Sequence, residues 1–387
     1  MKVIILAGLA PSTFFAHVSL ATALRDAGHQ VVVTTADDDV IPVVAAAGLP
    51  ALPVMEPGLT RHQMIADAGL GGLPEDAVER EYMAGRWFAL IEIKPLDALL
   101  AFARDWRPDV VIGGMLAYSA PLLAARLGVP YVRQAWDIHP TKLFDAGAAH
   151  QLREELAELG FDGLPEPDLM IEIVPPSLRA PETTPAQMMR WIPGNSQTRL
   201  EPWMYTKGAG ARIGVTVGTT VADYNQYDYV EGLVKNLVTL DAEVALAVSD
   251  AAVPVLRERL GENVRMGWAP LDILAPTCDV LVHQSGGSTL MTALSFGVPQ
   301  VLIPDPGQYR QTEMARRLVE AGAGLMLFPE QATTELVAEK CQEILSDPGY
   351  AAAAAGLAKE IAALPLPSEV ARRVERLVHS SAAGQGR

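Results

Sequence analysis

A turn of small and polar residues at positions 283–289, with the sequence HQSGGST, carries the strongest chemical signal in the chain. It follows the apolar run at residues 280–282, which is typical of a buried strand, and it precedes a stretch at residues 290–296 that is typical of a helix. The first N–H groups of such a helix have no partner within the helix, and the helix dipole attracts anions to the same end. The position of the turn therefore predicts a diphosphate-binding site.

The side chains of this turn suit the same ligand. Gly286 and Gly287 let the backbone come close to a bound group. Ser288 and Thr289 offer hydroxyl donors, and His283 offers a hydrogen bond or a positive charge. The alternative is a tight turn between strand and helix in which the glycines serve packing only.

A second turn of small residues includes Thr219 and Thr220 and follows the apolar run at residues 213–217. Parallel strands of one sheet bind ligands at their carboxyl ends, so two such turns are expected to face the same ligand. The pair of turns is more specific than either turn alone.

Two other patterns are weaker. The three aspartates at residues 37–39 have the chemistry of a Mg²⁺ or Mn²⁺ site. However, they precede a helix expected to begin near Val40, and carboxylates at this end of a helix cap it and interact favourably with its dipole. We prefer the capping interpretation. The turn at residues 8–13 reads GLAPST, which lacks the G-x-G-x-x-G pattern of dinucleotide binding. We therefore expect neither a metal nor a nicotinamide cofactor.

Short apolar runs alternate with amphipathic stretches in both halves of the chain, which predicts an α/β protein with parallel sheets. A proline-rich segment from residue 160 to 208 interrupts this rhythm, and we place the domain boundary near residues 194–212. The expected strands lie at residues 3–7, 30–35, 109–113, 131–134, 213–217, 243–248, 264–266, 280–282 and 301–303. The expected domains are two Rossmann-like units at residues 1–200 and 213–365, with a C-terminal helix within 366–387 that packs back on the first unit. The cleft between two such domains is the expected active site.

The composition supports this organisation. The chain has 387 residues, half of them hydrophobic, which is enough for two domains with separate cores. A net charge of −16 without a basic run argues against nucleic acid and against an anionic membrane as partners. Cys278 and Cys341 are too few for a disulfide framework or a metal quartet, which indicates two thiols in a reducing compartment.

An uncharged run at residues 3–24 has two interpretations. A signal peptide is one, because Lys2 precedes the run. However, Pro11 and His17 interrupt it, and it divides into a strand-like and a helix-like part. We favour the first strand–loop–helix of an α/β domain and a cytoplasmic location.

Further motifs give the chain a family resemblance. G-W-x-P at residues 267–270, H-x-x-G-G-x-T at 283–289 and G-V-P-Q at 297–300 occur in the order found in the donor-binding half of family 1 nucleotide-sugar glycosyltransferases. That family has the GT-B fold, in which two Rossmann-like domains with parallel sheets face an interdomain cleft. R-Q-A-W-D at 133–137 and L-E-P-W-M-Y at 200–205 resemble the urdamycin olivosyl C-glycosyltransferase and its relatives that act on aromatic polyketides.

The resemblance implies an inverting, metal-independent enzyme that needs no cofactor. Its donor would be a dTDP-deoxysugar and its acceptor an aromatic polyketide, and a homodimer stays open as a hypothesis. The implied donor-binding residues are Thr219, Thr220, Trp268, Ala269, His283, Gly286, Gly287, Ser288, Thr289 and Gln311. The implied acceptor-binding residues are Ser12, Phe14, Met64, Trp87 and Trp136, with an insertion at residues 55–86 facing the acceptor.

The usual catalytic pair of this family is missing. Thr13 stands where the family has a catalytic histidine, and Gly114 stands where it has the partner aspartate. His17 lies one helical turn beyond Thr13 and is a candidate base, although a buried helix histidine with an ordinary hydrogen bond is commoner. Arg310 replaces a sugar-binding aspartate before Gln311, which suits a sugar with fewer hydroxyls.

In the C-glycosylating relatives, an acid that matches Asp137 is the proposed base. Deprotonating a phenol pushes electron density onto the neighbouring ring carbon, which then attacks the anomeric carbon. The alternative is that Asp137 caps a turn before Pro140, and His139 is a second candidate base. The preferred hypothesis is C-glycosylation. O-glycosylation of a similar aglycone, a non-catalytic GT-B partner protein and a nucleotide-sugar epimerase are the alternatives.

Overall fold

The computed structural model describes residues 1–8, 10–35, 38–55, 74–138, 140–180, 185–217, 227–262, 264–306 and 309–385. The chain divides into two compact units. The first consists of Met1–Val174, Ala180–Arg190 and Leu364–Arg387, and the second of Pro175–Arg179 and Trp191–Ala363. The C-terminal segment therefore belongs to the same unit as the N-terminus.

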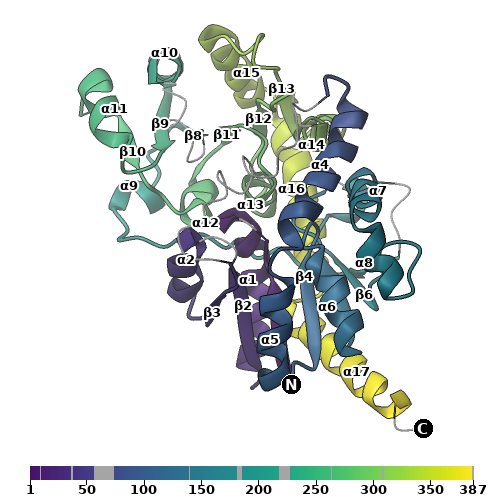
Figure 1. Ribbon diagram of the computed structural model, residues 1–387. Helices are drawn as coiled ribbons and strands as arrows, with labels where there is room; N and C mark the ends of the chain where they lie inside the picture. Colours follow the sequence, from purple (N-terminus) through teal and green to yellow (C-terminus); the bar gives the residue numbers. More distant parts are fainter. Residues whose placement is uncertain are drawn as a thin grey trace. The chain divides into compact units, whose positions relative to one another are not determined.

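The first unit is built on a parallel sheet, which has seven strands within the described residues, in the order β3-β2-β1-β4-β5-β6-β7 (Figure 1). β1 and β4 lie at its centre and pair from Val3 with Val110 to Leu6 with Gly113. Both strands are almost completely buried because helices cover the two faces of the sheet. The strands are β1 (Lys2–Leu6), β2 (Gln30–Thr35), β3 (Ala51–Pro53), β4 (Val110–Gly114), β5 (Tyr131–Gln134), β6 (Leu169–Glu172) and β7 (Gln187–Met188).

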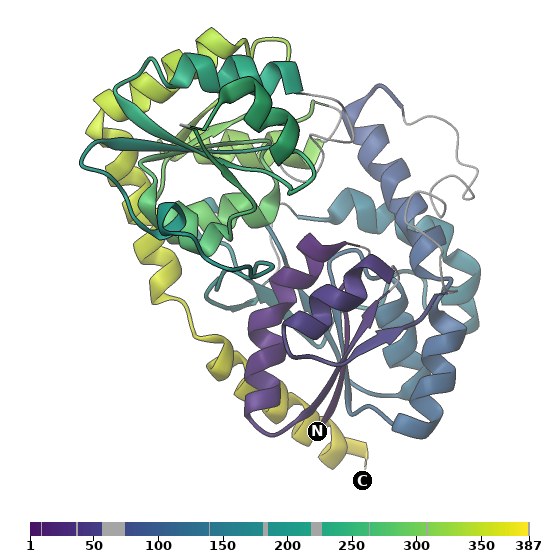
Figure 2. The same ribbon diagram turned by 90° about the vertical axis from the view of Figure 1, so that its left-hand side faces the viewer.

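The helices of the first unit lie on both faces of this sheet. Figure 2 shows α1 and the yellow α17 on one face and the blue helices α5 and α6 on the other. Close to the end of α1, Nε2 of His29 lies 2.7 Å from Oε1 of Glu375 in α17. The helices are α1 (Pro11–Asp26), α2 (Ile41–Ala46), α4 (Ala77–Glu92), α5 (Leu96–Trp106), α6 (Ser119–Leu127), α7 (Lys142–Gln151), α8 (Arg153–Glu158) and α17 (Pro367–Gln385).

α4 and α7 lie side by side and touch through two glycines (Figure 1). A Cβ atom at Gly85 would lie 2.0 Å from the carbonyl oxygen of Phe144, and one at Gly147 would lie 2.0 Å from that of Tyr82. Neither position can hold a side chain, so the two backbones approach as closely as glycine allows.

The second unit is also built on a parallel sheet, with six strands in the part of the chain that is described, in the order β10-β9-β8-β11-β12-β13. The strands are β8 (Ala211–Thr216), β9 (Ala242–Ala247), β10 (Arg265–Gly267), β11 (Val280–His283), β12 (Gln300–Leu302) and β13 (Gly324–Met326). The helices are α9 (Pro202–Tyr205), α10 (Tyr227–Leu237), α11 (Val253–Leu260), α12 (Leu271–Leu274), α13 (Gly287–Ser295), α14 (Tyr309–Glu320), α15 (Thr334–Ser346) and α16 (Pro348–Ala363).

Two apolar clusters fill the space between this second sheet and its helices. The larger contains Val230 and Leu233 of α10, Leu256 of α11 and Val337 of α15. The smaller contains Leu274 of α12 and Ala293 of α13. Helices therefore cover both faces, and the α/β fold with two parallel sheets that the sequence predicts is confirmed.

The structure differs from the sequence prediction in some elements. The expected strands are present, but the short strands β3, β6, β7 and β13 were not expected. Of the insertion at residues 55–86, residues 56–73 lie outside the described part, and residues 77–86 belong to α4 rather than to an irregular loop. Asp76 starts this helix, because its carboxylate accepts hydrogen bonds from the backbone N–H groups of Val78 and Glu79.

The uncharged N-terminal run folds as β1 and α1, as expected for the first strand–loop–helix of an α/β domain. None of the helices in the described ranges has the length and apolar character needed to span a membrane. Cys278 and Cys341 are both buried free thiols.

Candidate active site

The turn at residues 283–289 joins β11 to α13, as the sequence predicts. α13 begins after Gly286, which is its N-cap and gives the helix no side-chain cap. The first N–H groups of the helix therefore have no capping side chain from this position, and the backbone beside Gly286 and Gly287 is accessible because both residues are only half-buried. Ser288 and Thr289 in the first turn are also half-buried. This arrangement has the chemistry of an anion site.

His283 does not have the role that the sequence suggested. Its Nδ1 accepts a hydrogen bond from the N–H of Ser285 at 3.1 Å, and its Nε2 lies 2.7 Å from Oε1 of Gln300. Burial lowers the pKa of His283 to about 4, so the ring is neutral at pH 7. The expectation that His283 offers a charge or a spare hydrogen bond to a phosphate is therefore corrected, because both ring nitrogens already have partners inside the unit.

Ser285 connects this turn to α14. It has a positive φ of 61°, which is uncommon for a residue other than glycine, and it is fully buried. Its hydroxyl donates to the backbone oxygen of Gln311 at 3.0 Å, and Oε1 of Gln311 accepts from the N–H of Asp305. Gln311 thus lies beside the turn, and its role in donor binding stays a prediction. The roles of Ser285 and Gln300 were missed by the sequence analysis.

The remaining expected donor-binding residues lie before α12 or outside the described part of the chain. Trp268 is half-buried, and its indole N–H donates to the backbone oxygen of Ser196 at 3.3 Å. Ala269 is packed in the smaller apolar cluster with Leu281, and its place in a nucleotide pocket stays a prediction. Thr219 and Thr220 lie outside the described residues.

In the first unit, three of the predicted residues meet at the carboxyl ends of β1, β4 and β5. Gly114 ends β4, His17 lies on α1 after β1, and Trp136 follows β5. A Cβ atom at Gly114 would lie 2.6 Å from Cζ3 of Trp136 and 3.1 Å from Cε1 of His17. The indole therefore fills the space that any side chain at position 114 would need.

His17 is fully buried and neutral. Its Nδ1 lies 2.9 Å from the backbone oxygen of Thr13, and because a carbonyl oxygen only accepts, Nδ1 carries the proton. Nε2 then holds a lone pair, and this buried atom has no hydrogen-bond partner among the described residues. Burial lowers the pKa of His17 to about 4, and the bond to Thr13 offsets this only in part.

Asp137 is buried and lies in the segment between β5 and α7. An ion pair that the sequence analysis missed holds both ends of this segment. The guanidinium of Arg133 contacts the carboxylate oxygens of Asp145 at 2.6 and 2.8 Å, and it also donates to the backbone oxygen of Met115 and to Oγ1 of Thr141. The available signal was an arginine inside an expected buried strand, which requires a partner.

The other expected residues of the first unit lie on α1, on α4 or outside the described part of the chain. The hydroxyl of Thr13 donates to the backbone oxygen of Ala10 at 2.7 Å, and Ser12 is exposed. Phe14 is fully buried in the core, so the expectation that it faces an acceptor is corrected. Trp87 is half-buried on α4, and its indole nitrogen has no hydrogen-bond partner within the described residues. Met64 and His139 lie outside the described part of the chain.

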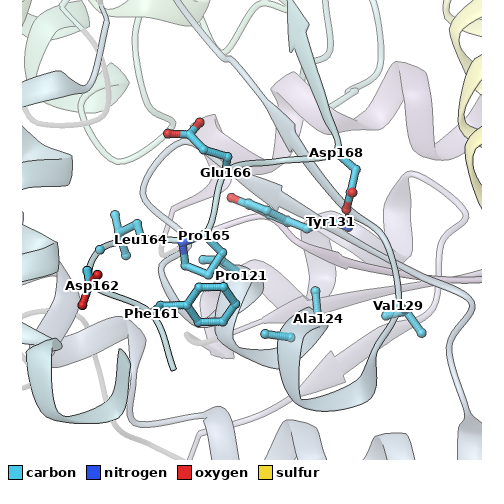
Figure 3. A pocket seen from close by; sticks show the side chains of 12 residues that line it. Pro121, Ala124, Val129, Tyr131, Phe161, Asp162, Leu164, Pro165, Glu166 and Asp168 are labelled. Carbon is cyan, nitrogen blue, oxygen red and sulfur yellow. Dashed lines mark hydrogen bonds between the residues drawn. The ribbon is translucent and has the colours of Figure 1, made fainter. Parts of the chain in front are cut away.

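A cavity of about 430 Å³ lies elsewhere in the first unit (Figure 3). It is lined by Phe161, Leu164 and Pro165 of one loop and by Val129 and Tyr131 at the start of β5. These residues are at the amino ends of the strands, whereas ligands of doubly wound sheets bind at the carboxyl ends. The cavity is therefore separate from the site that contains Trp136.

The three aspartates at residues 37–39 lie only partly within the described residues. Across the described ranges, no group of three or more His, Cys, Asp or Glu side chains is placed to hold a metal ion. Asp37 and the side chain of Asp39 lie outside the described part of the chain.

Two doubly wound parallel units, one of which has a turn with the chemistry of an anion site between a strand and a helix, have the fold of the GT-B glycosyltransferases. The chain matches the family models described as the erythromycin biosynthesis protein CIII-like N-terminal domain, over residues 22–218, and C-terminal domain, over residues 231–377. It belongs to this family of glycosyltransferases, and the relatives it matches include deoxysugar transferases of antibiotic biosynthesis.

Relatives of known name agree with this assignment. The chain is 33% identical to the L-demethylnoviosyl transferase of Streptomyces niveus, over 92% of this chain and 93% of the relative. It is 27% identical to the aclacinomycin-T 2-deoxy-L-fucose transferase of Streptomyces galilaeus, over 97% and 96% of the two chains. Among solved structures, the Streptomyces sp. SF2575 glycosyltransferase SsfS6 complexed with thymidine diphosphate has a TM-score of 0.83 and 31% identity, covering 97% of this chain and 99% of that one.

Proposed function

We propose that this glycosyltransferase moves a deoxysugar from a dTDP-sugar to an aromatic polyketide, with inversion at the anomeric carbon, and that the new bond is a C-glycosidic bond. The dTDP part of the proposal is supported by the turn before α13 and by the likeness to SsfS6, which was solved with thymidine diphosphate. The deoxysugar is supported by the names of the relatives. A homodimer and a cytoplasmic location stay predictions.

The observation that carries the C-linkage is the contact between Trp136 and Gly114. The indole takes the space that a side chain at position 114 would need, so a carboxylate cannot partner a histidine there. The hydroxyl of Thr13, where the family has its histidine, is turned back on Ala10. Asp137 then becomes the preferred base, because it is a buried carboxylate in the residue next to Trp136.

The proposed reaction follows from this assignment. Asp137 takes the proton of a phenol, and the carbon beside the phenolate oxygen attacks C1 of the sugar. The bond between C1 and the diphosphate oxygen breaks, and dTDP leaves with the bonding electrons. The N–H groups at the start of α13 stabilise the negative charge on the leaving group. Loss of the ring proton from the attacked carbon restores the aromatic ring.

One observation favours O-glycosylation as the second candidate. Nε2 of His17 holds a lone pair that has no hydrogen-bond partner among the described residues, and such an atom has the chemistry of a base for a hydroxyl group. Its pKa of about 4 makes it a weak base at neutral pH, and this is why Asp137 is preferred.

The test is product formation from dTDP-deoxysugars and a panel of aromatic aglycones, followed by mass spectrometry. The proposal predicts a product whose sugar survives acid hydrolysis and whose formation falls at least about 100-fold in Asp137→Asn, but not in the surface control Asp162→Asn. An acid-labile product that depends on His17 and not on Asp137 would establish O-transfer. Binding of dTDP without turnover would indicate a non-catalytic partner, and conversion of the donor without an acceptor would indicate an epimerase.

A further inference from the structure

A chain of buried hydrogen bonds runs through the second unit behind the turn at residues 283–289. The side-chain amide of Gln300, at the start of β12, donates to the backbone oxygen of Leu290 at 3.4 Å and accepts from Nε2 of His283 at 2.7 Å. Nδ1 of His283 accepts from the N–H of Ser285 at 3.1 Å. Gln300 and Ser285 are fully buried, and His283 is 2% exposed.

Each donor and acceptor in this chain is determined by its neighbour. The N–H of Ser285 only donates, so Nδ1 of His283 carries a lone pair and the ring proton is on Nε2. Nε2–H must then donate to Oε1 of Gln300. This orientation turns the NH₂ group of Gln300 toward the backbone oxygen of Leu290, which only accepts. The assignment is consistent at every position, so His283 has no hydrogen left to donate to a ligand.

The last hydrogen bond of this series acts on the backbone conformation of the turn. Ser285 has a positive φ, and an L-residue remains in that conformation only where its surroundings hold it. The hydrogen bond from the N–H of Ser285 to His283 holds it on one side, and the bond from its hydroxyl to the backbone oxygen of Gln311 holds it on the other. The direction in which the next residues, Gly286 and Gly287, present their N–H groups follows from this conformation.

We propose that Gln300 is a positioning residue for the donor diphosphate, and that it acts through His283 to hold Ser285 in the left-handed conformation that aims the first N–H groups of α13. His283 is then a positioning residue as well, rather than a phosphate ligand. The inference rests on the proposed function, because it takes the nucleoside diphosphate as the ligand of this turn.

The first experiment is dTDP binding by calorimetry with variants of both residues. Gln300→Met removes the acceptor for His283 at similar volume, and it is expected to weaken dTDP binding about 10-fold, which corresponds to about 1.4 kcal/mol. Asn236→Ala is the matched control. It removes a partly buried hydrogen bond to Thr334 elsewhere in the same unit, so it should leave the affinity for dTDP unchanged. Equal affinities of Gln300→Met and wild type would overturn the inference.

A pair of substitutions at position 283 separates positioning from direct contact. The Oδ1 atom of asparagine replaces Nδ1 as the acceptor for the N–H of Ser285, whereas glutamine reaches toward Gln300 and leaves that N–H unpaired. His283→Asn keeps the acceptor for Ser285 but loses the bond to Gln300, so it is expected to weaken dTDP binding about 10-fold, as Gln300→Met does. His283→Gln leaves the N–H of Ser285 unpaired and is expected to weaken dTDP binding by more than about 10-fold. Equal losses in both variants would indicate that the imidazole itself contacts the diphosphate. If Gln300→Met does not fold, this pair carries the test.

The tautomer of His283 gives a readout that needs no nucleotide. Nitrogen-15 NMR of histidine-labelled protein at pH 7 should show His283 as a neutral ring protonated at Nε2, and Gln300→Met should shift its Nε2 signal. A ring protonated at Nδ1, or an imidazolium, would overturn the inference. A wild-type protein that has the expected tautomer but does not bind dTDP would instead overturn the proposed function.

Discussion

The indole of Trp136 fills the space beside Gly114, because its Cζ3 atom lies 2.6 Å from where a Cβ atom at position 114 would be. Real Cβ atoms do not approach other heavy atoms so closely, so a tryptophan in this rotamer requires a glycine at the end of β4. The ring of His17 borders the same space, because its Cε1 atom lies 3.1 Å from that Cβ position. Gly114, Trp136 and His17 therefore form one structural feature.

Gly114→Ala should destabilise the protein and disturb the candidate acceptor site. The added methyl must displace the indole or the His17 ring, and such overpacking typically costs about 1–3 kcal/mol. Chemical denaturation measures the loss, and product formation should fall with it. Gly163→Ala is the control, because a Cβ there has nothing within 4 Å. Equal stability of the two variants would contradict the contact.

Arg133→Lys tests the ion pair that holds the segment containing Asp137. Lysine cannot reproduce the two parallel bonds of the guanidinium to Asp145, and a weakened buried pair should cost on the order of 2–4 kcal/mol of unfolding free energy. We also expect a lower kcat, because Thr141 loses one of its partners. The exposed pair of Arg126 with Glu158 is the control, and Arg126→Lys should change stability by less than about 0.5 kcal/mol.

Gly85→Ala should be more damaging than a typical surface glycine substitution. The obstacle is the backbone carbonyl of Phe144 at 2.0 Å, which cannot rotate away, so α4 and α7 would have to separate. A loss above about 3 kcal/mol is expected by thermal or urea unfolding. Gly356→Ala in the exposed part of α16 should instead stabilise by about 0.5–1 kcal/mol, since nothing lies within 4 Å and alanine is the better helix former. Similar effects at both positions would contradict the close crossing.

Glu92 should make the protein less stable as the pH rises. Burial raises the pKa of this carboxyl to about 8, above the value of 4.5 in the unfolded chain, so the folded state keeps a proton that the unfolded state releases. The contribution of the protonated Glu92 to the free energy of unfolding is fully present below pH 4.5 and is lost as the pH rises to about 8. Glu92→Gln should therefore gain a few kcal/mol relative to wild type between pH 5 and pH 8. Urea unfolding at both pH values checks this, and a constant difference would contradict it.

His17 should make the protein less stable as the pH falls. Its pKa in the folded state is about 4, below 6.5 in the unfolded chain, so the unfolded state binds the proton first as the pH falls. The stability present above pH 6.5 is then lost progressively toward pH 4, by up to about 3 kcal/mol for this residue. His17→Gln should unfold with a shallower pH dependence in this range. An unchanged slope between pH 6.5 and pH 4 would show that His17 is not buried as a neutral ring.

The sequence by itself determined the parts of this protein that depend on local patterns. Continuous apolar runs such as residues 3–6 and 110–113 indicate strands buried on both faces, and this signal needs no knowledge of the rest of the chain. The HQSGGST turn was predicted for the same reason, because a strand, small residues and a helix follow one another directly. The family motifs added the class of enzyme.

Only the tertiary structure decided which side chains meet. The contact of Trp136 with Gly114 depends on how β4 and β5 are aligned, and the bond from His283 to Gln300 depends on the register of β11 with β12. His283 was therefore predicted to face a phosphate, although its partners lie within the unit, and Phe14 was assigned to the acceptor site although it is buried. A residue type shows which bonds a side chain can make. Register and helix crossing decide which partner it finds, because these are set by the packing of the whole unit.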